Sequence, residues 1–248
     1  MKKTLIIAAL FCAASMSSFA QKKVAVVSFF CDKYIGTEQL DGAGSVVGLV
    51  AKLAENPDFN LKPALDDFYN TFNGSYSSQF PFDFIPEADV TGNEKYKAFE
   101  TDFKGIDLIS GGDPAKRFET IDGYKPFYEL FSLKKKELAA EMLGYFPDAD
   151  GVMFIFLSYE FIPKVAVGGM GTAGIKAYVN MRLYNKEGKK VFNMREGGTS
   201  KKTVAMIKGI PVMKPAEITP MCLNATEKLV KDLNKKVGKL AGKADKKL

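Results

Sequence analysis

Residues 152–157 (VMFIFL) form an unbroken apolar run, and residues 24–30 (VAVVSFF) form a second, nearly unbroken one. Apolar runs of this length, bounded by turn residues, are typical of strands that are covered on both faces. The turn at residues 147–151 (PDADG) leads directly into the later run. We therefore predict that the two segments lie side by side as central strands of one sheet.

Helical segments separate these strands. A helix is predicted at residues 46–53, and another at residues 132–144, where Ser132 caps the helix and Gly144 ends it. Between them, spacings of four, three and four residues place four apolar side chains on one helical face. These side chains are Leu61, Leu65, Phe68 and Phe72.

The second half of the chain predicts antiparallel strands. Residues 175–184 alternate apolar and polar side chains, which is typical of an antiparallel strand with one wet face. Residues 185–189 (NKEGK) predict a hairpin turn, and residues 190–194 return along the first strand. Earlier in the chain, residues 82–85 are flanked by prolines and predict a short strand at an edge of the sheet.

The last predicted element is an amphipathic helix that Thr219 caps and Pro220 begins. Its apolar stripe consists of Cys222, Ala225, Leu229, Leu233, Val237 and Leu240. The pattern as a whole predicts an α/β fold with a single mixed sheet, helices packed on it, an antiparallel hairpin late in the chain and this C-terminal amphipathic helix. No repeat or low-complexity linker divides residues 21–248, so we predict one α/β domain there.

The amino-terminal segment has the order of a secretory signal peptide. Lys2 and Lys3 precede an apolar stretch at residues 5–14, and small residues follow at 15–20. We expect cleavage near Ala20 and a periplasmic or secreted mature chain. The apolar stretch is too short to remain as a membrane-spanning helix, and no longer one follows, so we expect no transmembrane segment in the mature chain.

The charge pattern does not indicate nucleic-acid binding. The formal charge of +6 falls to +4 when Lys2 and Lys3 are removed, and the remaining charges are mixed along the chain. Lysines gather only near the C-terminus, where a solvated helix end is the interpretation favoured over a weak contact with an anionic surface. These lysines are Lys235, Lys236, Lys239, Lys243, Lys246 and Lys247.

The chain has no histidine, which excludes every histidine-dependent triad and the commonest zinc ligand. Asp66 and Asp67 are adjacent, and neighbours on a helix point in different directions, so they do not form a catalytic pair. We predict a protein that is not an enzyme and that needs no cofactor or metal ion. Catalysis by carboxylate or tyrosine chemistry remains the alternative.

Two short motifs imitate ligand sites. Residues 169–174 (GMGTAG) have the glycine spacing of a dinucleotide fingerprint, but an alternating strand follows them where that motif requires a helix. We interpret them as a flexible loop between two strands. Asp148 and Asp150 resemble the start of a calcium loop, but the later oxygen ligands are missing, so a turn into a strand is the simpler interpretation.

Asp32, Lys33 and Tyr34 follow the first predicted strand. In open α/β sheets, ligands bind in the crevice beyond the carboxyl ends of the strands, so these residues are the candidates for contact with a ligand. Cys31 and Cys222 are the cysteines that remain after signal cleavage. They can pair as a disulfide in an oxidising compartment, or each can be a buried free thiol.

Four phrases resemble small envelope α/β domains with an anticodon-binding-like fold. This family includes the periplasmic domain of the curli secretion-channel lipoprotein and the amino-terminal domain of the Tol-Pal propeller protein. The phrases are VAVVSFF at 24–30, FDFIP at 82–86, PDADGVMFIF at 147–156 and AYVNMRLYNKEGKKVF at 177–192. The resemblance implies scaffolding or partner binding in the cell envelope.

Two functional hypotheses follow. The first is a non-enzymatic exported protein that acts as an envelope-associated scaffold or partner-binding module, with envelope proteins or further copies of itself as partners. The second is a periplasmic protein that binds a small molecule or a lipid. The second is motivated by 20 phenylalanines and by the apolar segment at residues 204–213, although aromatic side chains more often fill a core.

Overall fold

The computed structural model describes residues 21–40, 46–101, 103, 113–127, 135–168, 170–244 and 248. The signal peptide predicted at residues 1–20 lies outside them. The strands are β1 (Lys23–Gly36), β2 (Asp83–Phe84), β3 (Phe118–Thr120), β4 (Gly151–Val167), β5 (Met170–Asn185), β6 (Lys190–Thr199), β7 (Val204–Ile207) and β8 (Ile210–Pro211). The helices are α2 (Val47–Glu55), α3 (Lys62–Thr71), α4 (Glu87–Thr91), α5 (Glu94–Ala98), α7 (Pro114–Arg117), α8 (Lys135–Tyr145), α9 (Pro215–Leu233) and α10 (Val237–Ala241).

The strands in the described part of the chain form one eight-stranded sheet. Its main order is β2-β1-β4-β5-β7-β8, with β3 paired to β1 and β6 paired to β5. β1 is parallel to both β2 and β4, whereas the other pairs are antiparallel. The predicted mixed sheet, with its two apolar runs side by side and a short edge strand, is confirmed.

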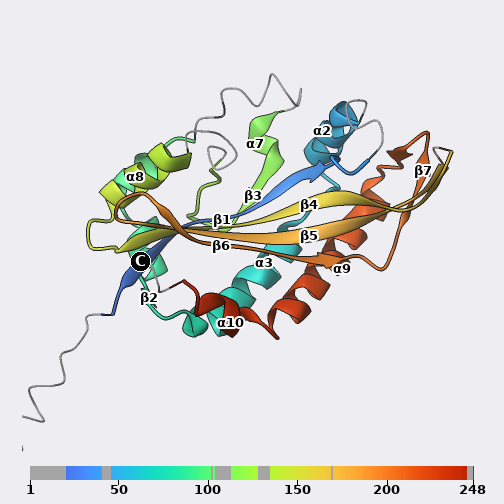
Figure 1. The fold of residues 1–248 in the computed structure, drawn as a ribbon. Helices are drawn as coiled ribbons and strands as arrows, with labels where there is room; N and C mark the ends of the chain where they lie inside the picture. The colour runs from blue at the N-terminus through green and yellow to red at the C-terminus, as the bar shows by residue number, and fades with distance from the viewer. Residues whose placement is uncertain are drawn as a thin grey trace, which may run out of the picture.

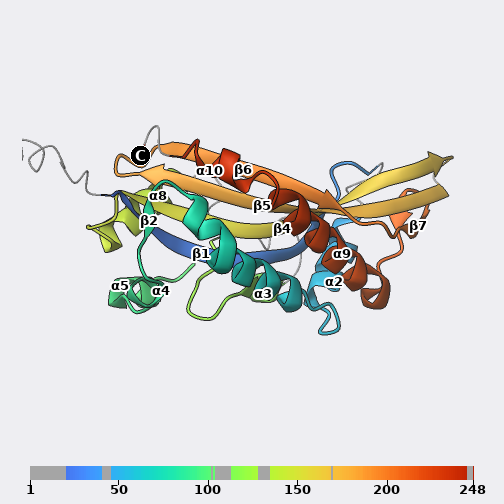
Figure 2. The same ribbon diagram turned by 90° about the horizontal axis from the view of Figure 1, so that it is seen from below.

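Helices cover both faces of the central strands (Figure 1). α3, α9 and α10 lie on one face, and the view from below places α3 and α9 across β1, β4 and β5 (Figure 2). On the opposite face, α5 and α8 contribute to a second apolar cluster. Alternate residues of β4 enter the two clusters: Met153 and Ile155 pack toward α3 and α9, whereas Phe154 and Phe156 pack toward α5 and α8.

The late hairpin is confirmed, but its second face is not wet. The turn closes through Gly188, which adopts a φ of 67° and donates its N–H to the Asn185 carbonyl. The apolar side chains of β5 face α9, as predicted. On the other face, the Tyr184 ring packs edge-on against Phe154 and the Arg182 guanidinium lies over the Phe156 ring. Polar residues therefore cover aromatic ones there.

Three predicted boundaries are wrong. Gly144 lies inside α8 rather than ending it, and the predicted cap Ser132 falls outside the described residues. The last helix begins at Pro215, so Pro220 lies within α9. The chain then bends after Leu233 and continues as the separate helix α10. The apolar stripe is nevertheless correct, because its residues from Cys222 to Leu233 are buried against the sheet.

Gly198 sets the distance between β6 and α9. A Cβ added at Gly198 would lie 2.3 Å from the Leu229 backbone nitrogen and 2.6 Å from the Ala225 carbonyl oxygen. Both are main-chain atoms, which can move away only if the helix moves. The absence of a side chain at Gly198 therefore allows α9 to pack directly on the sheet.

We expect Gly198→Ala to lower the free energy of unfolding by about 1–3 kcal/mol, because the added methyl overpacks this contact. Gly144→Ala is the matched control: no atom lies within 4 Å of its added Cβ, and it replaces a helical glycine. The control should raise stability by up to about 1 kcal/mol. Urea unfolding measures both, and equal stability of the Gly198 variant and the wild type would contradict the close packing.

Candidate functional site

The three predicted ligand-contacting residues lie inside β1, not in a turn beyond it. Asp32 and Lys33 are buried, and Tyr34 is half-buried. β1 continues to Gly36 because β3 and β4 supply hydrogen-bonding partners on its two sides. The predicted position at the end of the strand is therefore wrong. Contact of these residues with a ligand stays a prediction.

Arg117, at the end of α7, contacts both Asp32 and Tyr34. Its Nε donates to Asp32 Oδ1 at 2.8 Å and its Nη2 donates to Oδ2 at 2.6 Å, a two-pronged ion pair. The guanidinium also lies 4.7 Å from the centre of the Tyr34 ring. Asp32 Oδ1 accepts a further hydrogen bond, from the Tyr34 N–H at 2.9 Å. The Asp32 carboxylate is thus satisfied within the protein, and the pair holds α7 against β1.

Lys33 contacts a different carboxylate, so the three predicted residues do not converge on one site. Lys33 Nζ lies 3.8 Å from Glu119 Oε1, which also accepts the Leu61 N–H at 3.2 Å. The other oxygen, Glu119 Oε2, is buried and has no hydrogen-bond partner in the described part of the chain. Burial raises the pKa of the Glu119 carboxyl above its ordinary value, and the Leu61 N–H and Lys33 oppose that rise.

Cys31 and Cys222 are both buried free thiols. Burial raises the pKa of each thiol well above its ordinary value, so both stay protonated. A reactive cysteine needs thiolate character and access to solvent, and neither thiol has these. Both belong to the apolar cluster between the sheet and α9. The two thiols are unpaired in this structure, and their pairing in an oxidising compartment stays a prediction.

An open cavity of about 390 Å³ lies beside β2. Its walls include the Phe72, Phe84 and Tyr124 rings and the Glu87 side chain. Glu87 Oε2 accepts a hydrogen bond from the Tyr69 hydroxyl and lies 3.5 Å from the Tyr124 hydroxyl. Burial and the hydrogen bond to Glu87 raise the pKa of Tyr69 to about 12. At neutral pH the tyrosines are therefore neutral donors beside one carboxylate.

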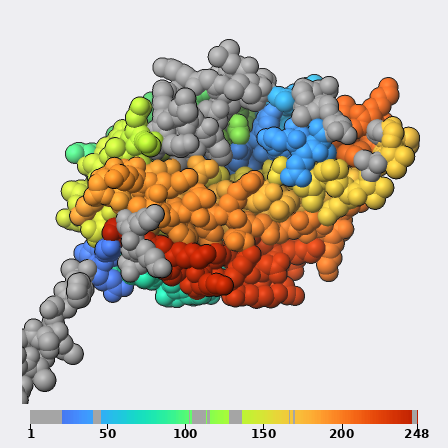
Figure 3. Space-filling view, in the orientation of Figure 1, coloured from blue at the N-terminus to red at the C-terminus, as the bar shows by residue number. Residues whose placement is uncertain are grey.

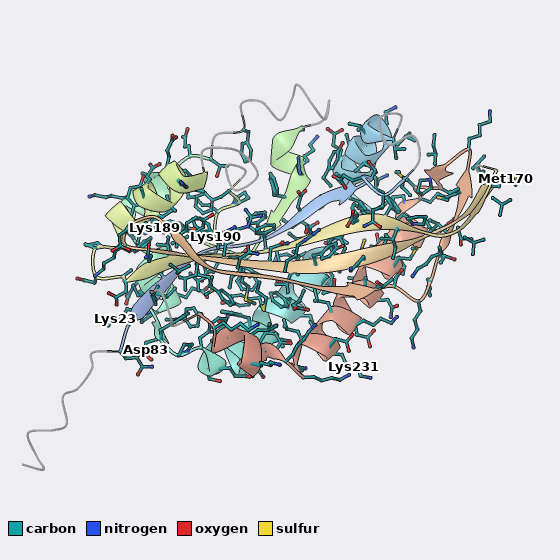
Figure 4. The ribbon with its side chains drawn as sticks, viewed as in Figure 1. Lys23, Asp83, Met170, Lys189, Lys190 and Lys231 are labelled. Atoms are coloured by element: carbon teal, nitrogen blue, oxygen red, sulfur yellow. The ribbon has the colours of Figure 1, made fainter. Side chains whose placement is uncertain are left out.

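The β4–β5 hairpin extends past the rest of the sheet. The last pair between β1 and β4 joins Gly36 to Glu160, whereas β4 and β5 stay paired as far as Val167 and Met170. We call the extension the arm: residues 161–176 of the hairpin, together with β7 and β8. It projects at one end of the molecule (Figure 3), and Met170 lies at the end opposite Lys189 and Lys190 (Figure 4).

The end of the arm carries large apolar side chains that face solvent. Val165, Val167, Met170 and Ile207 are 62%, 78%, 68% and 58% exposed, and we call these four residues the apolar tip. Paired residues of neighbouring strands point to the same face of a sheet. Val167 pairs with Met170, and the β5–β7 register, continued by one residue, places Ile207 opposite Met170. The three side chains thus form one row across three strands.

This geometry corrects the interpretation of residues 169–174 as a flexible loop. Gly171 and Gly174 are strand residues of β5, and Gly171 is paired on both sides, with Ala166 and Met206. Gly169 lies outside the described residues. The dinucleotide motif remains excluded, because strands and not a helix follow it.

The described residues also bear on three other kinds of function: metal binding, membrane spanning and contacts made by the C-terminal lysines. They contain no group of three or more histidine, cysteine, aspartate or glutamate residues placed to hold a metal ion. None of their helices has the length and apolarity needed to span a membrane. Of the C-terminal lysines, Lys235 pairs with Asp232 and Lys236 with Glu196, while Lys246 and Lys247 lie outside the described residues.

Comparisons with known proteins find similarity in structure only. No family model and no curated protein matches the chain. The hypothetical protein CT253 of Chlamydia trachomatis shares 13% identity at a TM-score of 0.36, covering 90% of this chain and 98% of that one. The lipoprotein GNA1162 of Neisseria meningitidis shares 13% identity at a TM-score of 0.27, covering 72% of this chain and 82% of that one. A Helicobacter pylori protein provisionally assigned as a neuraminyllactose-binding hemagglutinin homolog shares 9% identity at a TM-score of 0.34. The match covers 88% of this chain and 83% of that one.

One of these three neighbours is a bacterial lipoprotein. The resemblance to anticodon-binding-like envelope domains is not matched by a family model and stays a prediction. At this level of similarity, the role of the chain has to be argued from its own residues.

Sequence reasoning missed the apolar tip and the two charged residues that contact β1. Arg117 and Glu119 lie far from Asp32 in sequence, so no local pattern connects them. The sequence predicts a loop for the tip residues of the β4–β5 hairpin, and Ile207 lies in the apolar segment 204–213 that motivates the hypothesis of small-molecule or lipid binding. Apolar side chains in a sequence give no sign of exposure. A usable signal was present in the charges, since no acidic residue lies between Glu160 and Glu187.

We expect Glu119→Gln to raise the free energy of unfolding at neutral pH. A carboxyl whose pKa is raised by folding contributes stability below its unfolded pKa, about 4.3, and that contribution is lost as the pH rises through the folded pKa. The gain of the variant should therefore appear above this range and vanish below it. Urea unfolding at a series of pH values measures it, with exposed Glu137→Gln as the control. A variant less stable than wild type at neutral pH would contradict the assignment.

Proposed function

We propose that this chain is a non-enzymatic, exported binding protein of the cell envelope, and that it docks through the apolar tip of the arm. The observation that carries the proposal is the row formed by Val167, Met170 and Ile207. Apolar side chains at a projecting end are exposed to water at a cost, and contiguous exposed apolar surface marks interaction sites. A second surface that covers the row removes that cost.

The charged clusters of the described residues support a binding role over a catalytic one. The Asp32 carboxylate is held by Arg117, and Lys33 lies against Glu119. These carboxylates contact cations of the protein itself, and neither Asp32 nor Glu119 lines the cavity beside β2. The export that the proposal requires rests on the signal peptide predicted at residues 1–20.

Site-specific photocrosslinking in cells tests the docking. A photoreactive amino acid in place of Met170 should yield a crosslinked envelope component of defined mass, because the proposal places this side chain against the partner. The matched control is the same amino acid in place of Leu49, which is 41% exposed on α2. If position 170 gives no product beyond that seen at position 49, the proposed docking is wrong.

Binding of a small molecule in the cavity beside β2 is a second candidate function. The observation that favours it is the cavity of about 390 Å³, within the usual size of ligand sites. Aromatic rings and polar side chains line the cavity together, and the polar side chains include the carboxylates of Asp83 and Glu87. In this case the cavity, rather than the arm, holds the ligand.

Native mass spectrometry of gently purified protein tests the cavity. Wild-type protein should carry a retained mass, and Ser78→Trp should lose it, because Ser78 lines the cavity and an indole would fill part of it. Ser75→Trp is the control, since Ser75 is exposed in the short helical segment Phe72–Tyr76, just before the segment that holds Ser78, and does not line the cavity. Wild-type protein without any bound mass would refute this candidate.

A further inference from the structure

The arm is rich in lysine and has no acidic residue. Segments 161–176 and 199–214 contain neither aspartate nor glutamate. Their lysines are Lys164, Lys176, Lys201, Lys202, Lys208 and Lys214. The arm and the residues that flank β7 and β8 are therefore one of two strongly basic regions of the mature chain; the other is the C-terminal region at residues 228–247, with eight lysines and two aspartates.

Lys164 and Lys176 lie behind the apolar tip on the same side of the sheet. A Cβ added at Gly174 would lie 2.8 Å from Lys164 Cε, so the Lys164 chain crosses β5 at Gly174. Gly174 and Lys176 follow Met170 at even spacing along β5 and thus share its face. At about 3.3 Å per residue, Gly174 lies ~13 Å behind Met170. Along β5, the apolar row therefore lies at the end of the arm, and the ammonium groups of Lys164 and Lys176 lie farther from that end.

A second turn adds a lysine close to the tip. Ile207 pairs with Ile210 across the two-residue turn formed by Lys208 and Gly209. Both turn residues have positive φ, 52° and 77°, as a tight hairpin of this kind requires. Lys208 is exposed beside Ile207, so a positive charge directly flanks the apolar row.

We propose that the apolar tip inserts into the surface of a bilayer that contains anionic phospholipid, with the arm lysines against the headgroups. This inference rests on the proposed docking function and names its partner. Interfacial segments bury apolar side chains about 5–10 Å deep while basic side chains stay at the headgroup level. Met170 and Thr172 are two residues apart on β5, so the part of the arm between them is ~7 Å long, which lies within that depth.

The size of the tip favours a bilayer over a folded protein partner. A stable protein interface takes roughly 20–30 residues from each side. The apolar tip offers four large side chains, which is little for a protein interface. For a bilayer it suffices, because each basic residue near an anionic surface adds about 1 kcal/mol of attraction, or roughly fivefold in affinity.

Vesicle co-sedimentation tests the inference with the exported protein as cells process it. Wild-type protein should bind vesicles containing phosphatidylglycerol at least about tenfold more tightly than pure phosphatidylcholine vesicles, and added salt should weaken the binding. Val167→Ser with Met170→Ser should weaken it about tenfold by removing apolar contact. Lys164→Glu with Lys208→Glu should weaken it by at least about tenfold.

Two matched controls should bind like wild type. Leu49→Ser removes an exposed apolar side chain from α2, and Lys189→Glu with Lys190→Glu reverses two exposed charges at the opposite end of the sheet. All variants share one amino terminus, so any contribution from that end cancels in the comparison.

The outcomes separate this inference from the proposed function. If wild-type protein binds neither kind of vesicle, or if the tip variant binds as wild type does, the bilayer inference is overturned. The docking function then stands only if position 170 still crosslinks in cells, in which case the partner is a protein. If position 170 crosslinks to nothing while vesicles bind, the proposed function fails and the vesicle binding has no role in cells.

Discussion

The parallel pairing of β1 with β4 is the constraint on which the rest of the structure depends. Both strands are apolar on both faces, so each needs cover above and below. β4 sends alternate side chains into two separate clusters, and the Phe156 ring stacks on Phe30 of β1 at 5.2 Å. α3 and α9 therefore have to close one face while α5 and α8 close the other. Gly198 belongs to the same requirement, since it lets α9 approach the sheet closely enough to complete the first cluster.

The arm arises where this constraint ends. β1 stops at Gly36, opposite Glu160, but β4 and β5 remain hydrogen-bonded to one another and then to β7. Backbone pairing thus holds the hairpin extended where neither β1 nor a neighbour on that edge continues. Side chains such as Val165 and Val167 have the character of core residues, yet they lie largely exposed at the end of the arm. The strands that build the core therefore also present an apolar surface on a rigid support.

The sequence predicted the periodic parts of the fold and failed where contacts between distant segments decide. Apolar runs and stripes located β1, β4, α3 and α9, because the spacing of their apolar residues indicates which faces are buried. The sequence places Asp32 to Tyr34 beyond the first strand, since nothing local shows that Arg117 neutralises Asp32 and lets polar residues continue the strand. The glycines near residue 171 read as a loop, because their strand character comes from pairing with β4 and β7. The apolar tip was missed for a related reason: exposure depends on where the covering helices stop.

Charge and apolar surface act on different length scales, and the arm separates them in space. Attraction between the arm lysines and an anionic surface extends over about 10 Å at moderate salt, whereas apolar contact requires removal of the intervening water. The charge of the arm lysines therefore acts before the apolar contact forms. Because the arm extends past the last pair between β1 and β4, it presents the row of Val167, Met170 and Ile207 at its end. Docking then needs no rearrangement of the two apolar clusters, since the tip lies outside both.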